Sequence, residues 1–201
     1  MLDLNKQLIK FDTSFRNPIA GVDEVGRGPL AGPVVAAAVI INPKNIPKGI
    51  NDSKKLTKKN RLIIFEELKN SSIYSIAKAS VEEIDKINIL QASLLAMKRA
   101  IEGLEKSPST VLIDGNFKPK TSFEMHSIIK GDTKSLSIAA ASIIAKVYRD
   151  NLMKKLAIKY PNYCWEKNSG YGTKEHLSAI RKHGITSIHR KSFKPIYNIL
   201  N

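Results

Sequence analysis

The chain has 201 residues, of which 33 are Lys or Arg and 18 are Asp or Glu, so its formal net charge is +15 at pH 7. A chain of this length buries about 70% of its unfolded surface, and can therefore hold a hydrophobic core without disulfides. The apolar stretches 33–41 and 138–145 are far shorter than the ~20 residues that span a bilayer, so no membrane segment is expected.

Residue alternation and β-branched runs predict five strands. A segment dense in glycine and proline, 25–32, turns the chain from the first strand into the second. The first three strands are compatible with antiparallel pairing and the later ones alternate with helices, which predicts a mixed sheet. The predicted strands are 17–24, 33–41, 73–79, 110–114 and 123–129.

Helical periodicity and capping signals predict the helices. Ser80 and Glu83 form a capping box that opens a long helix, and Pro161 stops a later one. The expected fold class is therefore α/β, a mixed five-stranded sheet flanked by helices. We expect a single domain over 1–201, in which 161–201 form a small helical C-terminal extension. The predicted helices are 56–69, 80–104, 135–160 and 173–183.

The positive charge is concentrated in two stretches, 130–201 and 42–70. A strong positive field attracts polyanions, above all nucleic acid. A lysine-rich solvated surface is the alternative explanation, because charge alone does not identify a partner.

Cys164 is the single cysteine, so the chain contains no intramolecular disulfide. This fits a reducing cytosol, and we expect a cytoplasmic protein. Residues 1–15 lack the apolar core and small-residue cleavage site of a secretory signal. We interpret Cys164 as a core residue beside Trp165 rather than as a nucleophile.

Four carboxylates stand at or just after predicted strand ends. Asp23 and Glu24 end the first strand, Asp114 ends the fourth, and Asp132 follows the fifth. If the fourth strand lies beside the first, the ~4.8 Å spacing of neighbouring strands brings Asp114 within bridging range of Asp23. Acids this close repel one another unless cations neutralise them. Because hard divalent cations prefer oxygen ligands, the pattern predicts metal-assisted chemistry on a phosphate-rich substrate.

Each of these acids also has a structural explanation when it is considered alone. Asp114 and Gly115 form a turn dipeptide, and Asp132 can cap the helix that follows it. The metal-site hypothesis therefore depends on the convergence of all four side chains, which the sequence does not establish.

Residues 26–31, Gly-Arg-Gly-Pro-Leu-Ala, match a loose dinucleotide-binding pattern, with Asp52 about 20 residues further on. We reject a dinucleotide-binding oxidoreductase, because that pattern must open a helix and here Pro29 and Pro33 lead into a β-branched run. We interpret the segment as a tight loop whose bare backbone approaches a sugar or phosphate, with Arg27 as a phosphate partner.

Short motifs follow one another along most of the chain. They are GVDEVGRGPLAGPV at 21–34, NDSKKLT at 51–57, LIDGN at 112–116, KGD at 130–132, IAAASIIAKV at 138–147 and SGYGT at 169–173. Together they resemble the ribonuclease HII family, the bacterial type 2 ribonucleases H. The related ribonuclease HIII typically has Thr where this chain has Arg27, so Arg27 favours ribonuclease HII.

The resemblance implies a ribonuclease H-like fold and a metal-dependent endonuclease. It assigns catalysis and the binding of Mn²⁺ or Mg²⁺ to Asp23, Glu24, Asp114 and Asp132. The expected reaction is hydrolysis of RNA in RNA–DNA hybrids and on the 5′ side of single ribonucleotides in duplex DNA. The expected products carry a 5′-phosphate and a 3′-hydroxyl. Whether one metal ion or two act stays open.

The resemblance also implies how the substrate is bound. The loop Gly26-Arg27-Gly28 is expected to contact the ribose 2′-hydroxyl, the group that distinguishes RNA from DNA. Tyr171 is placed against the next deoxyribose, although considered alone it is a loop aromatic packed on the core. The expected phosphate contacts are Ser53, Lys54 and Lys55.

A non-catalytic basic module that binds nucleic acid is the alternative function. It explains the positive charge but leaves the four acids without a role. We expect a monomer without membrane contact. The basic tail, 185–201, either contacts a sliding clamp or is disordered.

Overall fold

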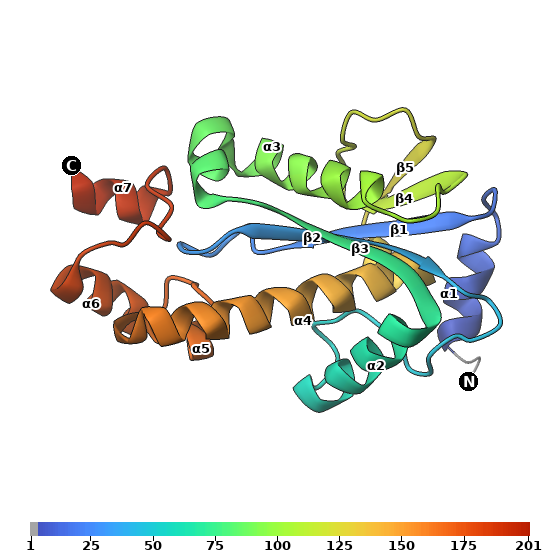
Figure 1. Ribbon diagram of the computed structural model, residues 1–201, viewed down its shortest axis with the longest axis horizontal. Coiled ribbons are helices and arrows are strands. Elements are labelled where there is room, and N and C mark those ends of the chain that lie inside the picture. Colours follow the sequence, from blue (N-terminus) through green and yellow to red (C-terminus); the bar gives the residue numbers. More distant parts are fainter. Residues whose placement is uncertain (1–3) are drawn as a thin grey trace.

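The computed structural model describes residues 4–201 and arranges them around one five-stranded sheet (Figure 1). The strand order is β3-β2-β1-β4-β5, with antiparallel pairing among β1, β2 and β3 and parallel pairing of β1 with β4 and of β4 with β5. The predicted mixed sheet is therefore confirmed. Residues 1–3 lie outside the described range. They belong to the segment 1–15 in which the sequence predicts no secretory signal. The strands are β1 (Ile19–Val25), β2 (Val34–Ile41), β3 (Ser72–Ala79), β4 (Thr110–Asp114) and β5 (Met125–Ile128).

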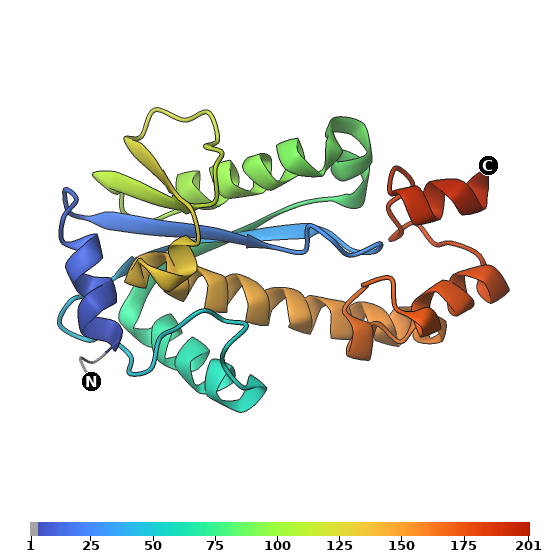
Figure 2. The same cartoon turned by 180° about the vertical axis from the view of Figure 1, so that it is seen from behind.

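Helices cover both faces of the sheet. α3 lies on one face, and α4 lies on the other with α1 and α2 beside it (Figures 1 and 2). Alternate residues of β2 supply the two cores, since Ala36 and Ala38 face α3 whereas Ala37 and Val39 face α4. No helix within residues 4–201 is long and apolar enough to cross a membrane. The helices are α1 (Leu4–Asp12), α2 (Lys58–Ser71), α3 (Val81–Glu102), α4 (Leu136–Lys159), α5 (Trp165–Asn168), α6 (Lys174–His183) and α7 (Lys194–Leu200), with short 3-10 turns η1 (Gly131–Thr133) and η2 (Pro161–Tyr163).

The first turn of α4 packs directly against β1 because residue 21 has no side chain. A Cβ atom at Gly21 would lie 2.0 Å from the carbonyl carbon of Ser137, closer than any real contact. This close approach brings the start of α4 against the strand that carries Asp23 and Glu24.

The long helix predicted over 80–104 is interrupted at one residue. Asn88 has φ +66°, and its Oδ1 accepts hydrogen bonds from the N–H groups of Leu90 (3.0 Å) and Gln91 (3.1 Å). Asn88 thus ends one helix and caps the next, a role that asparagine fills because it tolerates positive φ. The capping box of Ser80 and Glu83 is confirmed.

The C-terminal residues form a helical extension around Trp165, which is fully buried. The apolar cluster there joins the end of α4 to α6 and α7, and it includes Leu30 and Ala31 from the loop between β1 and β2. The extension lies at one end of the sheet, as Figures 1 and 2 show. The expected helical extension is confirmed, and its last helix, α7, falls in the tail that the sequence left open.

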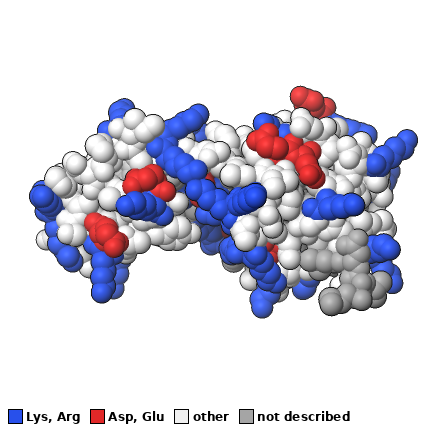
Figure 3. Space-filling view, turned by 90° about the horizontal axis from the view of Figure 1, so that it is seen from below, with Lys and Arg blue, Asp and Glu red and all other residues white. Residues whose placement is uncertain are grey.

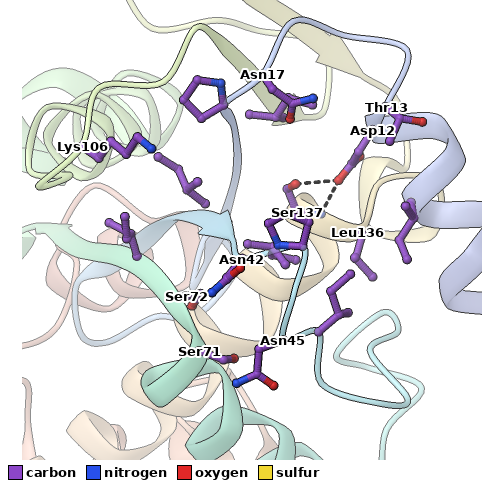
Figure 4. Close-up of a pocket in the computed structure, with 18 of the residues that line it drawn as sticks. Asp12, Thr13, Asn17, Asn42, Asn45, Ser71, Ser72, Lys106, Leu136 and Ser137 are labelled. Carbon is purple, nitrogen blue, oxygen red and sulfur yellow. Dashed lines mark hydrogen bonds between the residues drawn. The ribbon is translucent and has the colours of Figure 1, made fainter.

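The sequence predicts no element before residue 17, but the structure places α1 there. Asp12 at the end of α1 accepts hydrogen bonds from the backbone N–H (2.9 Å) and hydroxyl (2.6 Å) of Ser137, at the first turn of α4. Figure 4 shows these bonds at the edge of a cavity of about 730 Å³. Among the described residues that line it, none is a predicted site residue, and its single carboxylate already caps α4. The candidate site therefore lies elsewhere.

Candidate active site

The sheet brings Asp23 and Asp114 together. In the parallel pairing of β1 with β4, Val22 lies beside Ile113, so the next residues along the two strands are Asp23 and Asp114. Both follow residues that face α3, and both therefore project toward the α4 side of the sheet. The condition set for Asp114, that the fourth strand lies beside the first, is met.

Asp132 reaches the same place from the chain after β5. The N–H of Gly131 donates a hydrogen bond of 2.6 Å to Asp114 Oδ1, which fixes the turn η1 against the end of β4. Asp132 is the next residue and is buried, with 7% of its surface exposed. One carboxylate of the group therefore positions the loop that carries another.

The charges of these acids influence one another's pKa values. Burial, together with the charges of Glu24 and Asp114, raises the pKa of Asp23 well above its usual range. Burial raises the pKa of Glu24, although the guanidinium of Arg27, 3.3 Å from Glu24 Oε1, acts against this rise. Burial and then the charge of Asp114 raise the pKa of Asp132. These carboxylates repel one another across a partly desolvated site.

Two further residues complete the local charge balance. Asp52 is buried beside Asp132 and adds to the rise of its pKa. Burial alone would lower the pKa of Lys54, but the carboxylates of Asp132, Asp23, Asp52 and Asp114 together raise it. Asp52 Oδ1 also accepts the backbone N–H of Lys54 at 2.9 Å, so the acid and the amine are held by one turn.

The donor set fits a hard divalent cation. Carboxylate oxygens at this end of the sheet are the ligands that Mg²⁺ and Mn²⁺ prefer, and their mutual repulsion would be relieved by a bound cation. β1 continues to Val25, so Asp23 and Glu24 leave the strand on opposite sides. In accord with this, no three acidic, histidine or cysteine side chains within 4–201 lie close enough to enclose an ion alone. Such a site suits an ion that keeps water and substrate phosphate among its ligands.

The glycine loop (residues 26–33) and Tyr171 lie side by side next to these acids. Leu30 N–H donates a hydrogen bond of 2.8 Å to the carbonyl oxygen of Gly170. A Cβ atom built at Gly28 would lie 3.5 Å from Tyr171 Cε1, in van der Waals contact. Gly28 is exposed and Tyr171 is 47% exposed, so both can be reached from solvent. The structure thus brings together the two elements expected to contact the sugars.

The three expected phosphate contacts differ in exposure. Lys54 and Lys55 are exposed, whereas Ser53 is buried and its N–H donates to Ser142 Oγ at 3.3 Å. Lys and Arg side chains are spread over the face formed by α2 and α4, with patches of Asp and Glu between them (Figure 3). A polyanion approaching this face meets a net positive field.

Sequence reasoning missed several residues of this region. Asp52 enters it only as a ribose-binding acid in the rejected dinucleotide pattern, although the motif NDSKKLT could have pointed to it. Arg149 and Arg190 are buried against the glycine loop, and His176 contacts the carbonyl oxygen of Tyr171 at 2.8 Å. No local pattern distinguishes such buried polar residues from the many exposed ones in a basic chain.

Comparison with known proteins shows the family to which the chain belongs. The family model for ribonuclease HII matches residues 20–196. A ribonuclease HII from Wolbachia pipientis subsp. Culex pipiens is 58% identical over 179 residues, which cover 89% of this chain and 91% of that protein.

Solved structures show the same fold. Ribonuclease H2 from Pyrococcus horikoshii OT3 superposes with a TM-score of 0.75 and 29% identity, over 90% of this chain and 96% of that one. A ribonuclease HII from Archaeoglobus fulgidus, solved as a complex with PCNA, gives a TM-score of 0.68 and 26% identity, over 87% and 94% of the two chains. The chain therefore belongs to the ribonuclease HII family and is an endoribonuclease.

Proposed function

We propose that this enzyme hydrolyses RNA in RNA–DNA hybrids and cuts on the 5′ side of single ribonucleotides in duplex DNA, leaving a 5′-phosphate and a 3′-hydroxyl. The observation that carries this proposal is the meeting of the buried carboxylates with the glycine loop and Tyr171 at one end of the sheet. An enzyme that cuts at a ribonucleotide must both hydrolyse the phosphodiester and recognise the sugar. The carboxylates serve the first task, and the glycine loop and Tyr171 serve the second. The biological role that follows is the removal of misincorporated ribonucleotides in the cytosol.

The chemistry of each side chain determines its role in this reaction. Asp23, Glu24, Asp114 and Asp132 would supply ligands to Mg²⁺ or Mn²⁺ together with water and substrate phosphate, and the bound ion would polarise the scissile phosphate and lower the pKa of an attacking water. Lys54 neutralises part of the phosphate charge as the substrate approaches these acids.

The glycine loop contacts the 2′-hydroxyl of the ribonucleotide with its backbone. The ring of Tyr171 packs against the neighbouring deoxyribose, which lacks that hydroxyl. Exposed lysines, Lys55 among them, supply salt-dependent affinity without sequence choice.

A labelled duplex with one ribonucleotide tests this function. We expect the enzyme to cut once, 5′ of the ribonucleotide, with Mn²⁺ or Mg²⁺ and not with a chelator. Asp114→Asn should lower the cleavage rate by roughly 1,000-fold or more, because it removes a charged ligand from the metal site. Glu105→Gln is the matched control, since it removes one negative charge from an exposed loop residue.

Cleavage that persists in the chelator, or equal activity in Asp114→Asn and the control, contradicts the proposal. Binding of the duplex without any cleavage by the metal-loaded enzyme would instead support a non-catalytic module.

We also propose the C-terminal tail as a contact for a sliding clamp. The support is the PCNA complex of the Archaeoglobus relative, together with the exposed apolar side chains of Tyr197 and Leu200 on α7 (57% and 49% exposed). Replacing both by alanine should weaken clamp binding in calorimetry without changing cleavage in the absence of the clamp. Ile158→Ala, at an 83% exposed position on α4, is the control. Unchanged clamp binding by the double variant contradicts this contact.

A further inference from the structure

Two buried arginines hold the glycine loop through hydrogen bonds to its backbone carbonyl groups. Arg190 donates to the carbonyl oxygens of Gly26 (2.5 Å), Arg27 (2.9 Å) and Gly32 (2.9 Å). Arg149 donates to those of Ala31 (3.1 Å) and Pro33 (3.1 Å). The carbonyl groups at both ends of the loop are thus fixed by side chains rather than by a strand or helix.

These guanidinium groups are costly to bury. Arg149 and Arg190 are 1% and 0% exposed, and within residues 4–201 neither has a carboxylate oxygen at ion-pair distance. Burial lowers the pKa of Arg149 to about 10, and burial with the charge of Arg149 lowers that of Arg190 to about 9. Apolar side chains would fill the same space without this cost. The arrangement is therefore better explained by the geometry that it imposes than by packing.

That geometry leaves two backbone donors unused. In a trans peptide the carbonyl and the following N–H point in opposite directions. Since Arg190 draws the carbonyls of Gly26 and Arg27 inward, the N–H groups of Arg27 and Gly28 point away from it. No other described residue accepts a hydrogen bond from either N–H. Both are therefore available to an oxygen atom of a ligand at the exposed Gly28.

Arg149 connects the same loop to Tyr171. Its Nη1 donates to the carbonyl oxygen of Ser169 at 3.0 Å, two residues before the tyrosine. Gly26 has φ +95°, and a Cβ atom there would lie 2.2 Å from Arg149 Nε, so the arginine packs directly on the loop backbone. One guanidinium thus sets the distance between the glycine loop and the segment that carries Tyr171.

We propose that Arg149 and Arg190 are positioning residues for ribonucleotide recognition, which orient the N–H groups of Arg27 and Gly28 and place Tyr171 beside them. They act through the loop and do not touch the substrate. The inference rests on the proposed function, because it assumes that this loop contacts the 2′-hydroxyl.

Arg190→Lys is the main test, because one ammonium group cannot hold three carbonyls in a planar fork. We expect kcat on the single-ribonucleotide duplex to fall by roughly 10- to 100-fold, since small displacements of positioning groups have effects of that size. In an Asp114→Asn background, which prevents cleavage, the preference for this duplex over an all-DNA duplex should fall toward one. Affinity for the all-DNA duplex should persist, because phosphate contacts supply it.

Partial unfolding would lower binding of both duplexes equally and leave their ratio unchanged. Arg99→Lys is the matched control, because Arg99 also donates to a backbone carbonyl, that of Lys78, but lies on α3. A folded Arg190→Lys variant with the wild-type ratio and kcat overturns the inference, and Arg149→Lys should reproduce its loss of preference.

If neither variant folds, amide NMR signals in the Asp114→Asn protein decide the matter. The ribonucleotide duplex should shift the signals of Arg27 and Gly28 more than the all-DNA duplex does, and equal shifts overturn the inference. Wild-type enzyme that does not cut the ribonucleotide duplex would instead refute the proposed function itself.

Discussion

Asp23 illustrates how a single residue combines structural cost with function. It is 8% exposed, and its neighbours Glu24 and Asp114 carry the same charge. An arrangement that raises the pKa of a buried carboxyl disfavours the ionised form in the metal-free protein. The cost of burying this carboxyl group beside like charges is explained if the site binds a cation. Groups with strongly shifted pKa values occur most often in active sites.

His189 carries a pH-dependent part of the stability. It is 1% exposed, it lies 3.2 Å from His176 Nε2, and burial lowers its pKa to about 4 from 6.5. In the unfolded chain it takes up a proton near pH 6.5, whereas the folded state resists this until about pH 4. Its neutral form therefore stabilises the fold above pH 6.5, and this contribution is lost as the pH falls toward 4.

We predict that His189→Asn flattens this dependence. Between pH 7 and pH 4 the wild type should lose about 3 kcal/mol of unfolding free energy relative to the variant, given 1.36 kcal/mol per pKa unit. Urea denaturation at a series of pH values measures the difference, and comparing the two proteins cancels the acids with raised pKa values. His183→Asn, at an exposed position, should follow the wild type. Parallel curves for wild type and His189→Asn would show that the prediction is wrong.

At the scale of elements, the contact between α1 and α4 shows how a segment with no predicted structure is held. Asp12 accepts two hydrogen bonds from Ser137, and its charge lies at the positive N-terminus of α4. Burial raises the pKa of Asp12, so part of this gain is offset.

We predict that Asp12→Ala lowers the unfolding free energy by about 2 kcal/mol, because it leaves a buried N–H of Ser137 without an acceptor. Asp12→Asn keeps an acceptor oxygen and should lose less. Urea denaturation gives both values, and cleavage of the ribonucleotide duplex should be unchanged, since Asp12 is not among the acids expected to bind the metal. A variant Asp12→Ala as stable as the wild type would mean that α1 does not cap α4.

Local sequence patterns predict the elements whose formation depends on interactions between residues close together in the chain. The capping box at Ser80 and the β-branched runs identify α3 and the strands, because hydrogen bonds and side-chain periodicity act over a few residues. The break at Asn88 and the helix α1 escaped prediction. Asn88 has the sequence context of an ordinary helix, and α1 depends on a contact with Ser137, 125 residues away from Asp12.

At the scale of the whole molecule, the positive charge and the buried acids serve one arrangement. A net charge of +15 draws a polyanion to the surface. Within this positive surface, the negatively charged region to which we assign a function is the group of carboxylates at the end of the sheet. The field brings the substrate, and the acids would hold the ion that acts on it. The single domain over 1–201 and the monomeric state stay predictions.

At this scale, only some of the residues around the site can be predicted from the sequence. The acids could be singled out because each ends or follows an apolar run, and Asp23 and Asp114 come together because the fourth strand lies beside the first. Asp52, Arg149 and Arg190 could not be predicted as neighbours of the site, because they arrive from the loop before α2, from mid-α4 and from the tail. Only the folded chain places them together.

Direct titration of Mn²⁺ tests the claim on which the account depends, that these carboxylates form one cation site. Calorimetry should be done on the enzyme alone and on the enzyme bound to an all-DNA duplex, which supplies phosphate oxygens. We predict that wild type and Glu105→Gln bind Mn²⁺ alike and that Asp114→Asn binds it at least roughly 10-fold more weakly. Equal Mn²⁺ affinity of Asp114→Asn and the wild type under both conditions would contradict the account.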